Sequence, residues 1–199
     1  KSKSIIAKLS DITKKTEKYP FLQQNIKKQK NLLLNVVRGS GFYFANVGVK
    51  IIDNQNNSVD LIYEFELGKR AIIKKINFQG NKIFKDAKLR NVISSEEGKF
   101  WKFLTSNKYL DERKIILDEE QLRNYYKNKG YYNVKIKSSY AKNINNEFFE
   151  LNFNIDAGKK YFFNNVSLQL DQNFEDDNFI KIKKLLNKLN GKRFSTKIL

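Results

Sequence analysis

The stretch LRNYYKNKGYYNVKI, residues 122–136, joins the end of a charged helix to the start of a strand. Apolar residues recur at helical spacing up to Tyr126, and Gly130 stands where a left-handed C-cap ends a helix. After the glycine, Val134 and Ile136 alternate with lysines, which is typical of a strand with one buried face. The stretch therefore predicts a corner at which a helix ends and an amphipathic strand begins.

The same corner occurs earlier, in LLNVVRGSGFYFANVGVK, residues 33–50. There the aromatic pair Phe42 and Tyr43 follows Gly41, which lies 89 positions before Gly130. This spacing indicates an internal repeat, and its length is that of a small α+β domain.

A second pair of segments has nearly the same offset. VDLIYEFELGKRAIIKKINFQ, residues 59–79, matches FELNFNIDAGKKYFFNNVSLQ, residues 149–169. Gly68 and Gly158 are 90 positions apart, and an alternating strand lies on each side of both glycines. Two separated blocks with a common offset predict repeats that join strand to strand, with almost no linker.

The chain therefore divides into residues 1–69, a repeat without its first strand; residues 70–158, a complete repeat; and residues 159–199, the start of a third. The complete repeat has the order β-α-α-β-β, in the α+β class, with a small three-stranded mixed sheet packed on two helices. We expect its elements to be a strand at 71–80, a short helix ending near Ser94, a longer helix within 110–130 capped by Asp111, and strands at 133–141 and 148–158. The first repeat should have helices from Ser4 to about Glu17 and ending near Arg38, and strands at 47–52 and 59–67; the third should have a strand at 160–170 and a helix at 175–189.

Catalysis is not expected. Histidine and cysteine are absent, which excludes most zinc sites and the Ser-His-Asp and Cys-His triads. Adjacent acids occur at Glu96-Glu97, Glu119-Glu120 and Asp176-Asp177, and we expect them to be solvated surface groups. There is no glycine-rich phosphate loop and no apolar run long enough to span a membrane, so we predict no enzyme activity and no cofactor.

The formal net charge of +18 is compatible with two interpretations. A basic surface attracts nucleic acid, anionic lipid or acidic proteins, whereas a lysine-rich solvated surface needs no partner. Tyr125, Tyr126, Tyr131 and Tyr132, interleaved with lysines, would form a stacking platform for bases in a tandem RNA-binding protein. The alternative is that these tyrosines pack in the core at the helix–strand corner.

The order of these elements resembles the POTRA domain family. FQGNKIF (78–84) is similar to the family's strand, Gly-Asn turn and helix, and LRNYYKNKGYYNVKI is similar to its helix, Gly-Tyr break and strand. GKFWKFLTSNKYLDERKI (98–115) has Trp101 and Tyr109 where POTRA units have similar aromatic residues. The third repeat, with LQLDQNFEDD at 168–177, lacks the Gly-Asn turn, and the first has Gly-Phe in place of Gly-Tyr.

The resemblance covers the whole chain and implies the second, third and fourth units of a periplasmic array ahead of a membrane barrel that lies outside this chain. Such an array receives unfolded outer-membrane proteins and docks accessory assembly lipoproteins. No cofactor and no nucleic acid are implied. A third possibility is that the array acts only as a structural spacer.

The resemblance also implies that the strand 133–141 lies at a sheet edge. An edge strand offers unpaired N–H and C=O groups to which a partner strand can add by β-augmentation. Lysine on an edge is also a common protection against aggregation, so the two interpretations remain open. The partner-binding residues predicted on this basis are Asn133, Val134, Lys135, Ile136, Lys137 and Ser138, together with Val47, Val49 and Ile51 on the matching strand of the first repeat.

Overall fold

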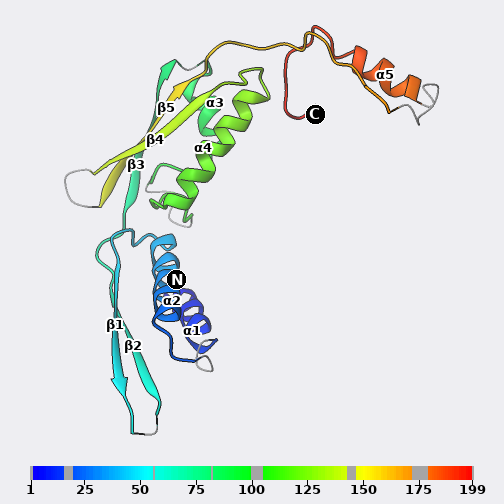
Figure 1. Ribbon diagram of the computed structural model, residues 1–199. Helices are drawn as coiled ribbons and strands as arrows, with labels where there is room; N and C mark the ends of the chain where they lie inside the picture. The colour runs from blue at the N-terminus through cyan, green and yellow to red at the C-terminus, as the bar shows by residue number, and fades with distance from the viewer. Residues whose placement is uncertain are drawn as a thin grey trace. The chain divides into compact units, whose positions relative to one another are not determined.

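A computed structural model describes residues 2–15, 20–55, 57–81, 83–99, 105–142, 147–171 and 179–198 (Figure 1). The chain forms two compact units, each built from three segments of the sequence. The first unit comprises Lys1–Ile76, Ser94–Ile116 and Tyr140–Leu151, and the second comprises Asn77–Ile93, Leu117–Ser139 and Asn152–Leu199.

The first repeat consists of two helices against a hairpin, all within the first unit. Helices α1 (Ser2–Lys14) and α2 (Gln23–Gly39) lie beside the antiparallel strands β1 (Asn46–Asp53) and β2 (Val59–Glu66), as Figure 1 shows. Val47 on β1 is paired with Phe65 on β2. Val47 and two residues of α2, Leu33 and Val37, are fully buried and belong to the core of this repeat. The predicted end of the first helix at Glu17 lies outside the described residues.

The second repeat contains all five predicted elements. They are β3 (Ile72–Asn81), α3 (Asp86–Arg90), α4 (Glu112–Lys127), β4 (Lys135–Lys142) and β5 (Phe148–Asp156), and the sheet order is β3-β5-β4. The three strands and α4 each run from one compact unit into the other. Figure 1 shows α3 and α4 on one face of this sheet, as expected for the α+β class.

The central strand β5 is the core of the second repeat. Phe149, Leu151, Phe153 and Ile155 alternate along it, and each is almost completely buried. The direction of β3 follows from its two ends: the Ile72 N–H donates to the Glu147 carbonyl at 2.6 Å, and Gly80 lies against Ile155. Because the residue numbers of both strands rise together, β3 is parallel to β5. Only five residues separate the end of β4 from the start of β5, which is too few for the crossover that parallel neighbours need, so β4 is antiparallel to β5 and the sheet is mixed.

Two expectations about the elements are wrong. Helix α3 has five residues and ends at Arg90 rather than near Ser94, because the chain beyond it is held on β3: the Gly98 N–H donates to the Ile73 carbonyl at 2.7 Å. Residues 160–170 form no regular strand, because their main-chain pairing is limited to residues 161–163, which bond to residues 191–194 around one bridge between Phe162 and Arg193. The third repeat does contain a helix, α5 (Ile180–Asn187), and residues 172–178 lie outside the described part of the chain.

The repeat spacing recurs in the backbone hydrogen bonds at the two Gly-Lys corners. In the first unit, the Ala71 N–H donates to the Gly41 carbonyl at 2.9 Å. In the second unit, the Tyr161 N–H donates to the Gly130 carbonyl at 2.7 Å. Residue 161 lies 90 positions after residue 71, and Gly130 has the predicted left-handed φ of 93°. The chain after each Gly-Lys corner is therefore attached to the helix end of the preceding repeat by an equivalent hydrogen bond.

Asp111 caps α4, as the sequence predicts. Its carboxylate accepts hydrogen bonds from the Arg113 N–H at 3.0 Å and from the Arg113 guanidinium, and it is almost fully buried. Asp111→Ala is expected to lower the free energy of unfolding by about 1–2 kcal/mol, because an unpaired helix N–H remains. Asp111→Asn keeps a capping acceptor and should lose less than half as much. Urea titrations of both variants test this, and equal losses would contradict the capping role.

Candidate functional site

β4 lies at an edge of its sheet, as expected, with β5 on one side. The strand begins at Lys135, two residues later than predicted, so Asn133 and Val134 precede it. The Val134 N–H is used in the corner, where it donates to the Tyr131 carbonyl at 3.3 Å. Asn133 is exposed, and its side-chain amide donates to the Tyr161 hydroxyl at 2.7 Å.

The side chains of β4 alternate between the core and solvent. Ile136 is 5% exposed, whereas Lys135 and Lys137 are exposed and Ser138 is half-buried. The lysines thus occupy the solvent face of the strand. They do not cover the main-chain groups that point sideways, out of the sheet edge.

A hydrogen bond to α4 identifies which main-chain groups of β4 point away from β5. The Ser138 N–H donates to the Glu119 carboxylate oxygen Oε1 at 2.6 Å. Because N–H groups of successive residues alternate between the two sides of a strand, Ile136 directs its N–H and C=O to the same outer side as Ser138. Lys137 directs its own groups toward β5. The outer edge of β4 is therefore formed by the main chain of Ile136 and Ser138.

The other edge of the sheet, β3, is covered along its first half. The Ile73 N–H donates to the Lys108 carbonyl at 2.8 Å, and the Ile73 carbonyl accepts from Gly98. The Ile76 N–H donates to the Glu97 carboxylate at 3.1 Å. These contacts come from the chain between α3 and α4, and they make β4 the more accessible edge among the described residues.

The expectation that the acid pairs are solvated is wrong for Glu97 and Glu119. Both carboxylates accept a hydrogen bond from an edge strand, and the Glu119 side chain is only 23% exposed. Glu120 is exposed, as expected. A signal for Glu119 is present in the sequence: it lies four positions after Ile115 and three before Leu122, on the apolar face of the helix. Asp176 and Asp177 lie outside the described residues.

The predicted site residues of the first repeat lie on β1, in a separate two-stranded sheet. Val47 is buried, and its N–H donates to the Asn46 side chain at 2.9 Å, so this N–H also points away from β2. Val49 is half-buried, and Ile51, nearer the tip of the hairpin, is 46% exposed. The structure therefore places the two groups of predicted residues on two different sheet edges and does not bring them together in one site.

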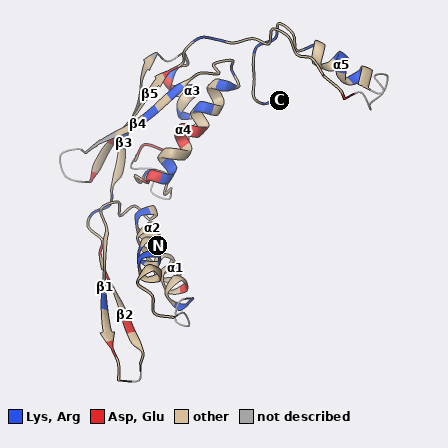
Figure 2. Ribbon diagram, viewed as in Figure 1, with Lys and Arg blue, Asp and Glu red and all other residues tan. Residues whose placement is uncertain are grey.

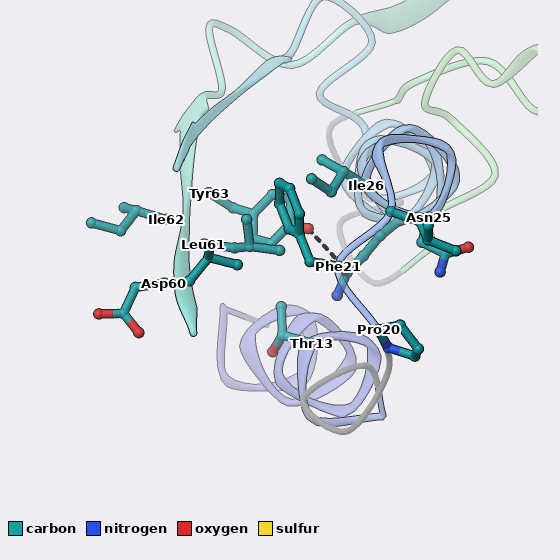
Figure 3. A pocket seen from close by; sticks show the side chains of 12 residues that line it. Thr13, Pro20, Phe21, Asn25, Ile26, Asp60, Leu61, Ile62 and Tyr63 are labelled. Atoms are coloured by element: carbon teal, nitrogen blue, oxygen red, sulfur yellow. Dashed lines mark hydrogen bonds between the residues drawn. The ribbon is translucent and has the colours of Figure 1, made fainter. Parts of the chain in front are cut away.

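The first repeat also has a cavity of about 620 Å³ beside β2 (Figure 3). It is lined by the end of α1, the start of α2 and residues 59–63 of β2. The Tyr63 hydroxyl donates to the side-chain oxygen of Gln29 at 2.6 Å, and burial raises the pKa of Tyr63. Of the β5 residues that match this part of β2, Phe149, Leu151 and Phe153 are almost completely buried in the second repeat, whereas Glu150 and Asn152 are half-buried.

Three of the four tyrosines of the opening stretch pack around Phe84. The rings of Tyr125, Tyr126 and Tyr131 make edge contacts with the Phe84 ring, with centroids 5.0–6.1 Å apart. Tyr126 is fully buried, and this burial raises its pKa. Tyr132 alone of the four is exposed, at 49%. The core-packing interpretation is therefore correct for Tyr126, whereas Tyr125 and Tyr131 are half-buried against Phe84 and Tyr132 is exposed.

Basic residues are distributed over α1, α4, β4 and α5 (Figure 2). Within the described part of the chain, no cluster of three or more acidic side chains that could hold a metal ion occurs. The helices described there also include none with the length and hydropathy needed to cross a membrane. Trp101 lies outside the described residues.

Comparison with known proteins identifies the repeat. The family model described as "POTRA: Surface antigen variable number repeat" matches residues 71–158. The outer membrane protein assembly factor BamA of Neisseria meningitidis serogroup B is 28% identical over 136 residues, which cover 68% of this chain and 17% of that protein. BamA of Buchnera aphidicola is 29% identical over 140 residues, which cover 66% of this chain and 21% of that protein. The chain thus spans about a fifth of the length of these relatives.

Solved structures agree on the fold. The crystal structure of Haemophilus influenzae BamA POTRA3-5 aligns with a TM-score of 0.52 and 14% identity, covering 90% of this chain and 67% of that chain. BamA from Haemophilus ducreyi lacking POTRA domains 1-3 also has a TM-score of 0.52, with 19% identity, covering 72% and 24% of the two chains. The relatives are named as assembly factors rather than enzymes, in agreement with the prediction of no catalytic function. Residues 71–158 therefore match the POTRA repeat, and the chain has the fold of solved BamA POTRA structures and is similar in sequence to BamA assembly factors over about two thirds of its length.

Proposed function

We propose that the chain is part of the periplasmic POTRA region of an outer-membrane protein assembly factor. In this role it binds unfolded outer-membrane proteins by β-augmentation at the outer edge of β4, and it docks accessory assembly lipoproteins. Attachment to the membrane is through a barrel outside this chain. The family assignment of residues 71–158 and the names of the relatives support this proposal.

The observation that carries the proposal is the unequal covering of the two sheet edges. The chain between α3 and α4 bonds to β3 at Ile73 and Ile76, whereas Ile136 and Ser138 direct their main-chain groups outward from β4. Main-chain pairing depends little on the partner's side chains. This suits a site for many different barrel strands, which alternate apolar and polar residues over about 9–11 positions.

Lys135 and Lys137 are compatible with this role. Both lysines lie on the solvent face of the sheet. A partner strand added in the plane of the sheet therefore contacts the aliphatic parts of these side chains and not their ammonium groups. Their charge discourages pairing between two copies of the same edge, since like charges would face each other. Thus lysine protection against self-association and β-augmentation by a less basic partner are compatible on one strand.

Two other functions are disfavoured. An RNA-binding array needs exposed aromatic rings, but Tyr125, Tyr126 and Tyr131 are packed around Phe84. A purely structural spacer would need no accessible strand edge, and β4 lies at one.

An amide NMR titration tests the proposal. The probe is a peptide of about ten residues in which valine and threonine alternate, with blocked termini, since this is the pattern of a barrel strand. Shifts concentrated on Ile136 and Ser138, with smaller shifts on Val47 and Val49, are expected. The same titration with single-stranded RNA should show only weak, salt-sensitive changes. RNA shifts centred on Tyr132 without a peptide response would contradict the proposed function.

A further inference from the structure

A side chain of the protein itself already occupies an outward N–H of β4 that a docking strand would use. The Glu119 carboxylate accepts from the Ser138 N–H, and an antiparallel or parallel partner strand would need to accept from the same outward group. An ionised acceptor makes a shorter and stronger hydrogen bond than a neutral carbonyl does. The 2.6 Å between the Ser138 nitrogen and the Glu119 oxygen is slightly shorter than the roughly 2.7–3.2 Å of ordinary N–H···O bonds.

The second oxygen of Glu119 has a neighbour of its own. Glu119 Oε2 lies 3.8 Å from the Arg123 guanidinium, one helical turn further along α4. This pair holds the carboxylate near the strand, and it offers the carboxylate an alternative position when Ser138 is taken by another acceptor. Both side chains are partly buried, at 23% exposure for Glu119 and 34% for Arg123, so the contact is not a freely rotating surface pair.

The first repeat provides an internal contrast. By the 89-residue offset, position 30 corresponds to Glu119 and Val49 corresponds to Ser138. Position 30 is lysine, which has no acceptor for a main-chain N–H. The competing carboxylate is therefore a feature of the second repeat and not a requirement of the fold.

We propose that Glu119 gates the β4 edge: its carboxylate occupies Ser138 in the unbound protein, and a docking strand must displace it. This inference rests on the function proposed above and adds a control on the affinity of the site. The gate disfavours short or poorly matched segments, because only a strand that pairs along several residues gains enough hydrogen bonds to replace this contact.

The test compares Glu119→Ala with the wild-type chain, using the blocked valine–threonine peptide and the amide NMR titration. Removal of the competitor is expected to tighten binding at β4 about three- to tenfold, the equivalent of one net hydrogen bond. Glu119→Gln retains a neutral acceptor and should fall between the two. Glu120→Ala is the matched control, since it removes the same charge from the next residue of α4, which is exposed. Its dissociation constant should stay within about twofold of the wild-type value.

Amide hydrogen exchange gives a readout that does not depend on the peptide. The Ser138 amide should exchange faster in Glu119→Ala than in the wild-type chain or in Glu120→Ala. Equal peptide affinity in Glu119→Ala and the wild-type chain, with β4 shifts present in both, would overturn the gate and leave the proposed function standing. Absence of β4 shifts in every variant would overturn both the gate and the proposed function. Faster exchange of the Ser138 amide in Glu119→Ala would then show that the Glu119–Ser138 hydrogen bond forms without regulating a partner.

Discussion

Gly80→Ala is expected to lower the free energy of unfolding of the second repeat by about 3 kcal/mol or more. Gly80 has a φ of 84°, which costs about 1–2 kcal/mol for a residue with a Cβ. The position is also closed sterically: an added Cβ would lie 2.5 Å from the Ile155 main-chain oxygen and in contact with the Asn154 side chain. A main-chain neighbour in the central strand cannot rotate away, so β3 would have to shift relative to β5.

Gly68→Ala separates the conformational cost of a positive φ from the steric cost of the added Cβ. Gly68 has a similar φ of 63°, but an added Cβ there would meet no atom within 4 Å. This variant should lose only the conformational cost, about 1–2 kcal/mol. A urea titration followed through the amide signals of Leu151 and Phe153 reports on the β3–β5 pairing, and the corresponding signal for the control is that of Tyr63 on β2. Equal losses for the two variants would show that the contact with Ile155 relaxes without cost.

The fold was predictable from the sequence because the strongest signals are local and occur twice. A glycine that ends a helix and an alternating strand after it have the same order at Gly41 and Gly130, and the Gly-Lys corners have the same spacing. Such features depend on main-chain conformation and on burial along one element. They are therefore retained whatever the other elements do, and the structure contains the corresponding hydrogen bonds at both corners.

The errors occur where distant parts of the chain determine the outcome. The helical pattern beyond Arg90 is interrupted because Gly98 is bonded to β3, a contact that no local propensity encodes. The segment 160–170 alternates like a strand but has only one bridging partner among the described residues. The acidic pair Glu119-Glu120 on a helix indicates solvated side chains, since such pairs usually are solvated. The position of Glu119 on the apolar face of α4 indicates otherwise, but the identity of its partner, the Ser138 N–H, depends on the packing of α4 against the sheet.

Ser138→Pro is expected to weaken peptide binding at β4 by about 10- to 100-fold. Proline removes the outward N–H that a partner strand needs, and its ring blocks close approach at that point. The folded sheet should tolerate the change, because the Ser138 N–H points away from β5 and takes no part in the ladder. Unchanged amide shifts of Leu151 and Phe153 would verify that the sheet is intact.

Ser138→Ala distinguishes main-chain pairing from side-chain recognition. It removes the hydroxyl but keeps the N–H, so peptide affinity should change by less than about threefold if binding is by β-augmentation. Combining Ser138→Pro with Glu119→Ala adds a further distinction: with no N–H at residue 138, the carboxylate has nothing to compete for, and its removal should no longer tighten binding. A large loss of affinity in Ser138→Ala, or an undiminished gain from Glu119→Ala in the proline background, would show that the peptide recognises side chains near β4 and does not extend the sheet.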